Sequence, residues 1–158
     1  MTITLESLQR GAPPKPPRIL VYRVHGIGKT TFAATAPSPV VIQTEAGLGP
    51  LDVATSPLAK TYQDVMDALT VLATEPHEFQ SVIIDSLDWF EPLVWQHTLR
   101  QHPTTEKGVA VANIDDYGFG KGFNLATDYW RDYIDALNYL RDQRSMTIIQ
   151  IEPPTIKR

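Results

Sequence analysis

The sequence predicts a parallel, doubly wound α/β domain. Short runs of aliphatic residues recur along the chain, and a stretch with helical periodicity follows most of them. Strands buried on both faces read as continuous aliphatic runs, and parallel strands need a crossover helix between them. With 158 residues, the chain is long enough for one domain with a substantial core. We therefore expect one sheet with helices on both of its faces.

Four strands are expected, and each is a short run rich in Val, Ile or Leu. Pro153 and Pro154 end the last of them, because proline cannot donate to a sheet ladder. The four runs are Ile19–Tyr22, Val40–Gln43, Val82–Asp85 and Met146–Ile151.

Helices are expected between these strands, the first over Lys29–Ala36 up to Pro37. The next, near 61–73, carries one apolar face with a 3.6-residue period. That face consists of Tyr62, Val65, Met66, Leu69 and Leu72. A third, near 88–101, is expected to place Trp89, Leu93 and Trp95 near the core.

The fourth expected helix, near 123–143, is the longest and has its own apolar stripe. The stripe consists of Leu125, Tyr129, Trp130, Tyr133, Leu137 and Leu140. The stretch before it, 103–122, is looser and contains "DYGFGKG", which we interpret as a glycine-rich hinge or lid. Ahead of the first strand, residues 1–17 form a proline-rich arm that cannot enter a helix or central strand. We therefore divide the chain into an arm, 1–17, and an α/β domain, 18–158.

Composition excludes several classes of protein. No apolar run approaches the roughly 18 residues needed to span a membrane, and the N-terminus lacks a signal-peptide core. The absence of cysteine excludes disulfides and thiolate metal sites and favours a cytoplasmic location. The net charge of −4 argues against a broad basic face for nucleic acid, so DNA contact would need a local patch or an assembly.

A phosphate-binding motif joins the first strand to the first helix. In Gly26-x-Gly28-Lys29-Thr30, the glycines let backbone N–H groups curl around phosphate oxygens. Lys29 would reach the β- and γ-phosphates, and the Thr30 hydroxyl would ligate Mg²⁺. The expected nucleotide-binding residues are Gly26, Ile27, Gly28, Lys29, Thr30 and Thr31. The alternative is an ordinary strand–helix turn with a surface lysine.

Two acidic residues follow buried strands and complete the expected site. Asp85 ends "SVIID" and would hold the metal together with Thr30. Glu45 follows the second strand, at the sheet edge where ligands of open α/β folds bind, and could orient the attacking water. The alternatives are that Asp85 caps the next helix and that Glu45 is a solvated loop acid. His77, His97 and His102 lack metal-ligand spacing, so we expect no metal beyond Mg²⁺.

Taken together, "LVYRVHGIGKTTFA", "IQTEAGLGPLDV", "SVIIDSLDW", "DYGFGKGF" and "MTIIQI" make the sequence similar to a known family. It resembles the RecA-like ATPases, specifically the short phage-borne members of recombination and single-strand annealing. The resemblance implies a three-layer P-loop NTPase core with a mostly parallel sheet, shortened at its C-terminus. In it, the last strand lies between the loop strand and the Asp85 strand. It implies ATP and Mg²⁺ as cofactors, Glu45 as catalytic base, Lys29 as a catalytic phosphate ligand, and Thr30 and Asp85 at the metal.

The resemblance also implies partners and a setting. These are nucleotide, single-stranded DNA bound through an assembly, and further copies of the chain or a recombination protein. The setting is the cytoplasm of a bacterial host of a phage. The first strand would be an unpaired edge in such a shortened core, so we expect self-association.

Three positions depart from the family pattern. Arg23 replaces the first glycine of the loop, Ala46 replaces an acidic residue after Glu45, and Pro153 replaces a polar γ-phosphate sensor. Arginine at 23 is tolerated if its backbone is ordinary and costs about 1–2 kcal/mol if φ is positive. These departures leave a second hypothesis open, in which a degenerate P-loop domain serves as a protein-interaction module. A third, a small-molecule kinase, lacks a convincing arginine-bearing lid.

Overall fold

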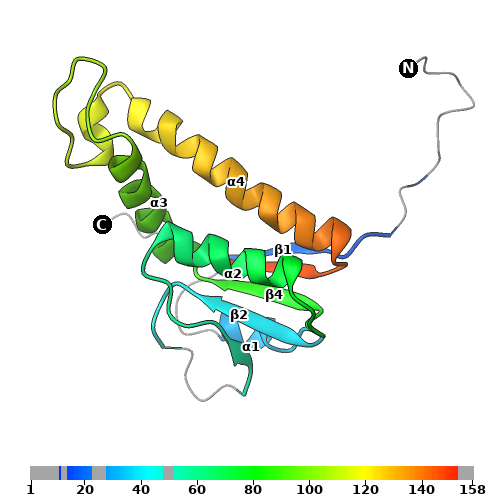
Figure 1. The fold of residues 1–158 in the computed structure, drawn as a ribbon. Helices are drawn as coiled ribbons and strands as arrows, with labels where there is room; N and C mark the ends of the chain where they lie inside the picture. Colours follow the sequence, from blue (N-terminus) through cyan, green and yellow to red (C-terminus); the bar gives the residue numbers. More distant parts are fainter. Residues whose placement is uncertain (1–10, 12–13, 23–27, 48–51, 153–158) are drawn as a thin grey trace, which may run out of the picture.

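The computed structural model describes residue 11 and residues 14–22, 28–47 and 52–152. Its sheet has the order β1-β5-β4-β2-β3, and all neighbouring strands pair in parallel (Figure 1). The α/β class and the parallel sheet are therefore as predicted, and β5 lies between β1 and β4 as the resemblance implies. The strands are β1 (Arg18–Tyr22), β2 (Pro39–Gln43), β3 (Ala54–Thr55), β4 (Ser81–Asp85) and β5 (Thr147–Glu152).

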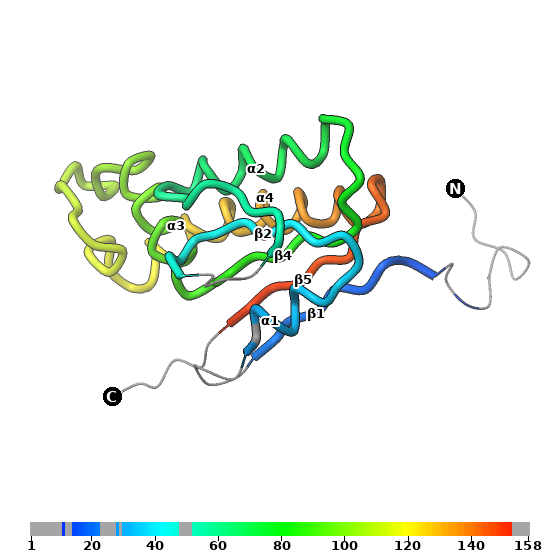
Figure 2. The backbone as a smooth tube through the Cα atoms, turned by 90° about the horizontal axis from the view of Figure 1, so that it is seen from below, coloured from blue at the N-terminus to red at the C-terminus, as the bar shows by residue number. Residues whose placement is uncertain are grey.

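Helices cover both faces of the sheet, which gives three layers. α1 (Lys29–Ala33) packs on one face and ends earlier than the expected Ala36. The other helices pack on the opposite face, and Figure 2 shows α1 on the far side of the sheet from them. These are α2 (Tyr62–Thr74), α3 (Leu87–Gln101) and α4 (Lys121–Gln143), with a short 3₁₀ helix, η2 (Ile114–Tyr117), before α4.

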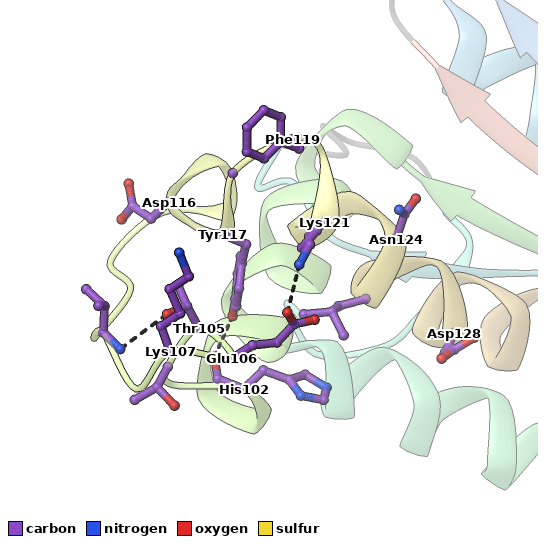
Figure 3. A pocket seen from close by; sticks show the side chains of 14 residues that line it. His102, Thr105, Glu106, Lys107, Asp116, Tyr117, Phe119, Lys121, Asn124 and Asp128 are labelled. Carbon is purple, nitrogen blue, oxygen red and sulfur yellow. Dashed lines mark hydrogen bonds and ion pairs between the residues drawn. The ribbon is translucent and has the colours of Figure 1, made fainter.

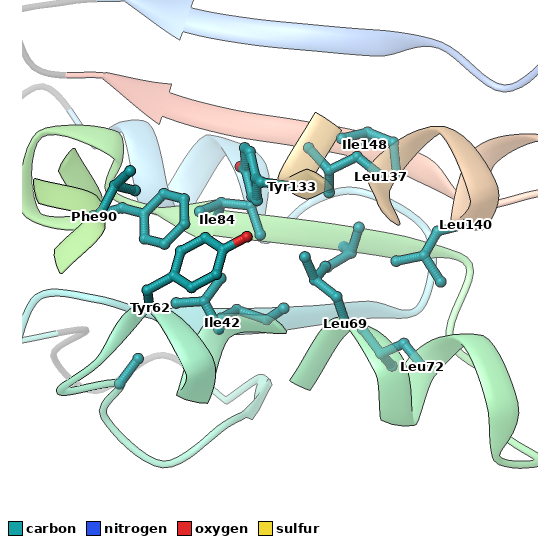
Figure 4. Close-up of a cluster of buried hydrophobic side chains, with 14 of the residues drawn as sticks. Ile42, Tyr62, Leu69, Leu72, Ile84, Phe90, Tyr133, Leu137, Leu140 and Ile148 are labelled. Carbon is teal, nitrogen blue, oxygen red and sulfur yellow. The ribbon is translucent and has the colours of Figure 1, made fainter. Parts of the chain in front are cut away.

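The larger core lies between the sheet and α2, α3 and α4 (Figure 4). Its centre is aromatic: the buried rings of Phe90 and Tyr133 lie 4.8 Å apart. The predicted face of α2 is confirmed, since four of its members are buried and Met66 packs against them. In α4, the predicted Tyr133, Leu137 and Leu140 are buried, while Leu125, Tyr129 and Trp130 pack at the margin.

The prediction for α3 was wrong at Trp89, whose side chain is 52% exposed. The buried residues of this helix are Phe90, Val94 and Thr98, which recur every four positions. Successive helical residues differ by about 100° in direction, so placing Phe90 inward turns Trp89 toward solvent. Leu93 and Trp95 still pack against the core from its margin.

β1 forms an edge of the described sheet, as expected. Its pairing partner among the described residues is β5, and the side chains of Leu20 and Tyr22 are each 59% exposed. The described end of the proline-rich arm contacts the last turns of α4. There Lys15 pairs with Asp142 at 2.9 Å, and the Arg141 side chain donates to the Pro16 carbonyl at 2.7 Å. No helix in the described part of the chain is long and apolar enough to cross a membrane.

Candidate nucleotide-binding site

Gly28 directly precedes the first residue of α1 and adopts a left-handed conformation (φ 75°, ψ 36°). Glycine suits this position because a side chain with a Cβ makes a positive φ energetically unfavourable. Its carbonyl accepts the first bond of the helix, from the Phe32 N–H at 2.8 Å. Thr31 lies exposed on the same turn. Arg23, Gly26 and Ile27 lie outside the described residues, and Lys29 is described by its backbone only.

Thr30 and Asp85 meet at the carboxyl edge of the sheet, although 55 positions separate them in the sequence. The Thr30 hydroxyl donates to Asp85 Oδ2 at 2.6 Å in a partly buried position. α1 supplies the hydroxyl, and the end of the central strand β4 supplies the carboxylate. The structure thus brings together the two residues that the sequence assigned to the metal.

Glu45 stands beside this pair because β2 is the neighbour of β4. The last registered residues of the two strands are Gln43 and Asp85. Beyond them, the Asp85 carbonyl accepts the Thr44 N–H at 2.9 Å and the Glu45 N–H at 3.3 Å. The Glu45 side chain is partly exposed, and its Oε2 lies 3.4 Å from the Ser86 hydroxyl. Thr30, Asp85 and Glu45 therefore share one edge of the sheet.

Two residues of the site were missed by sequence reasoning. Thr44 and Ser86 are buried, and a pair of hydrogen bonds joins the Thr44 hydroxyl to the Ser86 backbone. The Ser86 hydroxyl also contacts Asp88 Oδ1. A threonine after an aliphatic strand carries no sequence signal of its own, and only the pairing of β2 with β4 reveals its partner.

The described residues near the site include three neighbouring carboxylates, Asp88, Glu91 and Glu152. At the end of β5, burial raises the pKa of Glu152, and the neighbouring charges of Asp88 and Glu91 raise it further. Burial and Asp88 also raise the pKa of Glu91. Carboxylates crowded in this way favour a nearby cation, because a cation offsets their mutual repulsion.

The donor set at this edge fits Mg²⁺ bound together with a nucleotide. Among the described residues, no group of three or more His, Cys, Asp or Glu side chains could hold a metal alone. Mg²⁺ keeps several waters and typically takes one or two protein oxygens plus substrate phosphates. The converging hydroxyl of Thr30 and carboxylate of Asp85 are ligands of that kind.

A cavity of about 820 Å³ lies away from this edge, between the segment after α3 and the start of α4 (Figure 3). Lys121 and Glu106 both line this cavity, and Lys121 Nζ lies 2.9 Å from Glu106 Oε2. The predicted glycine-rich hinge borders it, with Gly118 and Gly120 at positive φ. Gly122 is fixed by close approach instead, since a Cβ there would stand 2.0 Å from the Ile114 carbonyl oxygen.

Fold and site together define a class of protein. A parallel sheet, a glycine turn opening the first helix, and a Thr–Asp pair at the carboxyl edge are the arrangement of a P-loop NTPase. The sequence profile of the AAA domain family matches residues 15–153. The chain therefore belongs to this family and is a nucleotide-binding domain of the P-loop ATPase type. No curated protein matches the chain.

Proposed function

We propose that this protein hydrolyses ATP at the carboxyl edge of the sheet and requires Mg²⁺ to do so. The observation that carries the proposal is the 2.6 Å bond from Thr30 to Asp85, with Glu45 just beyond the end of the neighbouring strand β2. Three separate segments contribute one group each, and P-loop chemistry needs these three groups in one place. Membership of the AAA domain family supports the same reading.

Each residue has a distinct part in the proposed reaction. The backbone of residues 26–30 and the Lys29 ammonium would bind the phosphates. Thr30 would ligate Mg²⁺ through its hydroxyl, and Asp85 would hold a water of the ion, whose charge offsets that of the β- and γ-phosphates. Glu45 would accept a proton from the attacking water, because its carboxylate lies at the same edge without being sealed from solvent.

Release of inorganic phosphate from ATP tests this proposal. We expect Mg²⁺-dependent hydrolysis by the wild-type protein and none by Lys29→Ala, which removes the phosphate ligand and leaves the sheet intact. A wild-type protein that folds and binds Mg²⁺-ATP but releases no phosphate would refute hydrolysis. Arg23 and Pro153, two of the departures from the family pattern, lie outside the described residues. Because the wild-type protein carries both, its rate of phosphate release includes their effect on hydrolysis.

We further propose that the ATPase acts in phage DNA recombination or single-strand annealing. The similarity of the sequence motifs to RecA-like phage proteins supports this, and the arrangement of β5 between β1 and β4 agrees with that similarity. The net charge of −4 favours DNA contact through an assembly of copies over contact by a single domain. Salt-dependent retention of single-stranded DNA in the presence of ATP is expected, and the slope with salt counts the phosphates contacted.

The competing function is a protein-interaction module that keeps the fold without the chemistry. Ala46 favours it, since the resemblance implies an acidic residue at this exposed position next to Glu45. A folded protein whose melting temperature does not respond to Mg²⁺-ATP would select this alternative.

A further inference from the structure

The registered pairs of β2 and β4 end two residues before the proposed catalytic base. Gln43 and Asp85 are the last registered pair, the next two positions are Thr44 and Ser86, and Glu45 follows directly. The contacts that join Thr44 to Ser86, together with the backbone bonds from Thr44 and Glu45 to the Asp85 carbonyl, therefore determine where Glu45 stands relative to Asp85.

A single hydroxyl makes that connection. Thr44 Oγ1 donates to the Ser86 carbonyl at 2.6 Å and accepts from the Ser86 N–H at 2.7 Å. The side chain thus adds two bonds to the backbone bond from the Thr44 N–H to the Asp85 carbonyl. Thr44 is 5% exposed and Ser86 1% exposed, so water does not compete for these bonds.

We propose that Thr44 is a positioning residue for ATP hydrolysis, whose hydroxyl clasps the Ser86 backbone and thereby holds Glu45 at a fixed distance from Asp85. The inference rests on the proposed function and adds a residue to it. Positioning matters here because a misplacement of about 1 Å costs on the order of 100-fold in rate.

The Ser86 side chain is a separate contributor. Its hydroxyl lies 3.4 Å from Glu45 Oε2 and closer to Asp88 Oδ1. It carries one proton and donates to one carboxylate at a time, and the shorter contact is with Asp88. Glu45 therefore keeps its lone pairs for the attacking water. Ser86→Ala removes this hydroxyl and leaves the clasp intact, since the clasp uses the backbone of Ser86.

Steady-state ATP hydrolysis by variants at position 44 tests the inference. We expect Thr44→Val to lower kcat roughly 10- to 100-fold, while KM and the ATP dissociation constant stay within about twofold of wild type. Thr44→Ser restores the hydroxyl and with it most of kcat. Ser86→Ala lowers kcat less than Thr44→Val does.

Thr98→Val is the matched control. Thr98 is also buried, and its hydroxyl donates to the Val94 carbonyl at 2.9 Å within α3, away from the site. The same substitution there is expected to change melting temperature without changing kcat. A merely structural contribution of Thr44 would make its Val variant behave like this control.

The outcomes separate the two proposals. A wild-type protein inactive on ATP overturns the proposed function and this inference with it. Full kcat in folded Thr44→Val, or a larger loss in Ser86→Ala, overturns the positioning inference alone. If Thr44→Val does not fold, Thr44→Cys takes its place, because the thiol is a weak hydrogen-bonding group of similar size. Equal kcat for the Cys and Ser variants then overturns the inference, and a clear loss in Cys supports it.

Discussion

Replacing Thr30 with valine removes the hydroxyl at the centre of the site and keeps the shape of the side chain. The lost bond is 2.6 Å long, partly buried and made to a carboxylate. Hydrogen bonds to charged groups contribute about 1.5–3 kcal/mol, and partial exposure places this one at about 1.5 kcal/mol. For a chain of this size, each kcal/mol corresponds to about 2–4 °C, so we expect a fall of about 3–6 °C in the melting temperature of the nucleotide-free protein.

The same variant is expected to lose the part of ATP affinity that depends on Mg²⁺. Losing one metal ligand should weaken Mg²⁺-ATP binding at least about 10-fold, or 1.4 kcal/mol, relative to wild type. Calorimetric titration with and without Mg²⁺ measures this, and Thr30→Ser should restore it. Thr35→Val is the control, since the Thr35 hydroxyl is exposed and donates to the Phe32 carbonyl at 2.7 Å. An unchanged response to Mg²⁺ in Thr30→Val would refute the assignment of the metal site.

Three further predictions concern the base, the hinge and the response to pH. Glu45→Gln should lower kcat about 100-fold or more with ATP affinity retained; equal hydrolysis by both proteins would contradict the assignment of the base. Gly122→Ala should destabilise the protein by about 1–3 kcal/mol in urea, because its Cβ would stand 2.0 Å from the Ile114 carbonyl oxygen; an unchanged midpoint would show that the segment shifts freely. Burial, and then the charge of Arg100, lower the pKa of His97 below 6.5 in the folded protein. As the pH falls, the unfolded chain therefore protonates its histidine before the folded protein does, and the folded protein loses stability below pH 6.5. His97→Phe should reduce the fall in melting temperature between about pH 7.5 and 5.5; identical slopes for the two proteins would count against it.

The sheet and its main helices were predictable because their residues are patterned by burial. The apolar face of α2 repeats every three to four positions, and the structure buries Tyr62, Val65, Leu69 and Leu72. β3 was missed because its two residues, Ala54 and Thr55, are exposed and form no aliphatic run. A two-residue strand gets its stability from its neighbour β2, and its own sequence does not reveal that.

The candidate site divides in the same way. The Gly-Lys-Thr motif and Asp85 have sequence signals, and the structure brings Thr30 and Asp85 into contact. Thr44 has none, because its partner is 42 positions away and is reached only when β2 pairs with β4. The prediction for Trp89 was wrong for a local reason. The buried stripe of α3 includes the polar Thr98, so the apolar pattern alone does not identify this stripe.

The most direct measurement of the central claim is a titration of the wild-type protein and Lys29→Ala with Mg²⁺-ATP. We expect saturable binding by the wild-type protein with a dissociation constant in the millimolar range or tighter, equivalent to about −4 kcal/mol or better. Lys29→Ala should bind far more weakly while keeping its melting temperature. If folded wild-type protein shows no binding, or if Lys29→Ala binds equally well, the assignment of a nucleotide-binding site around Lys29 is contradicted.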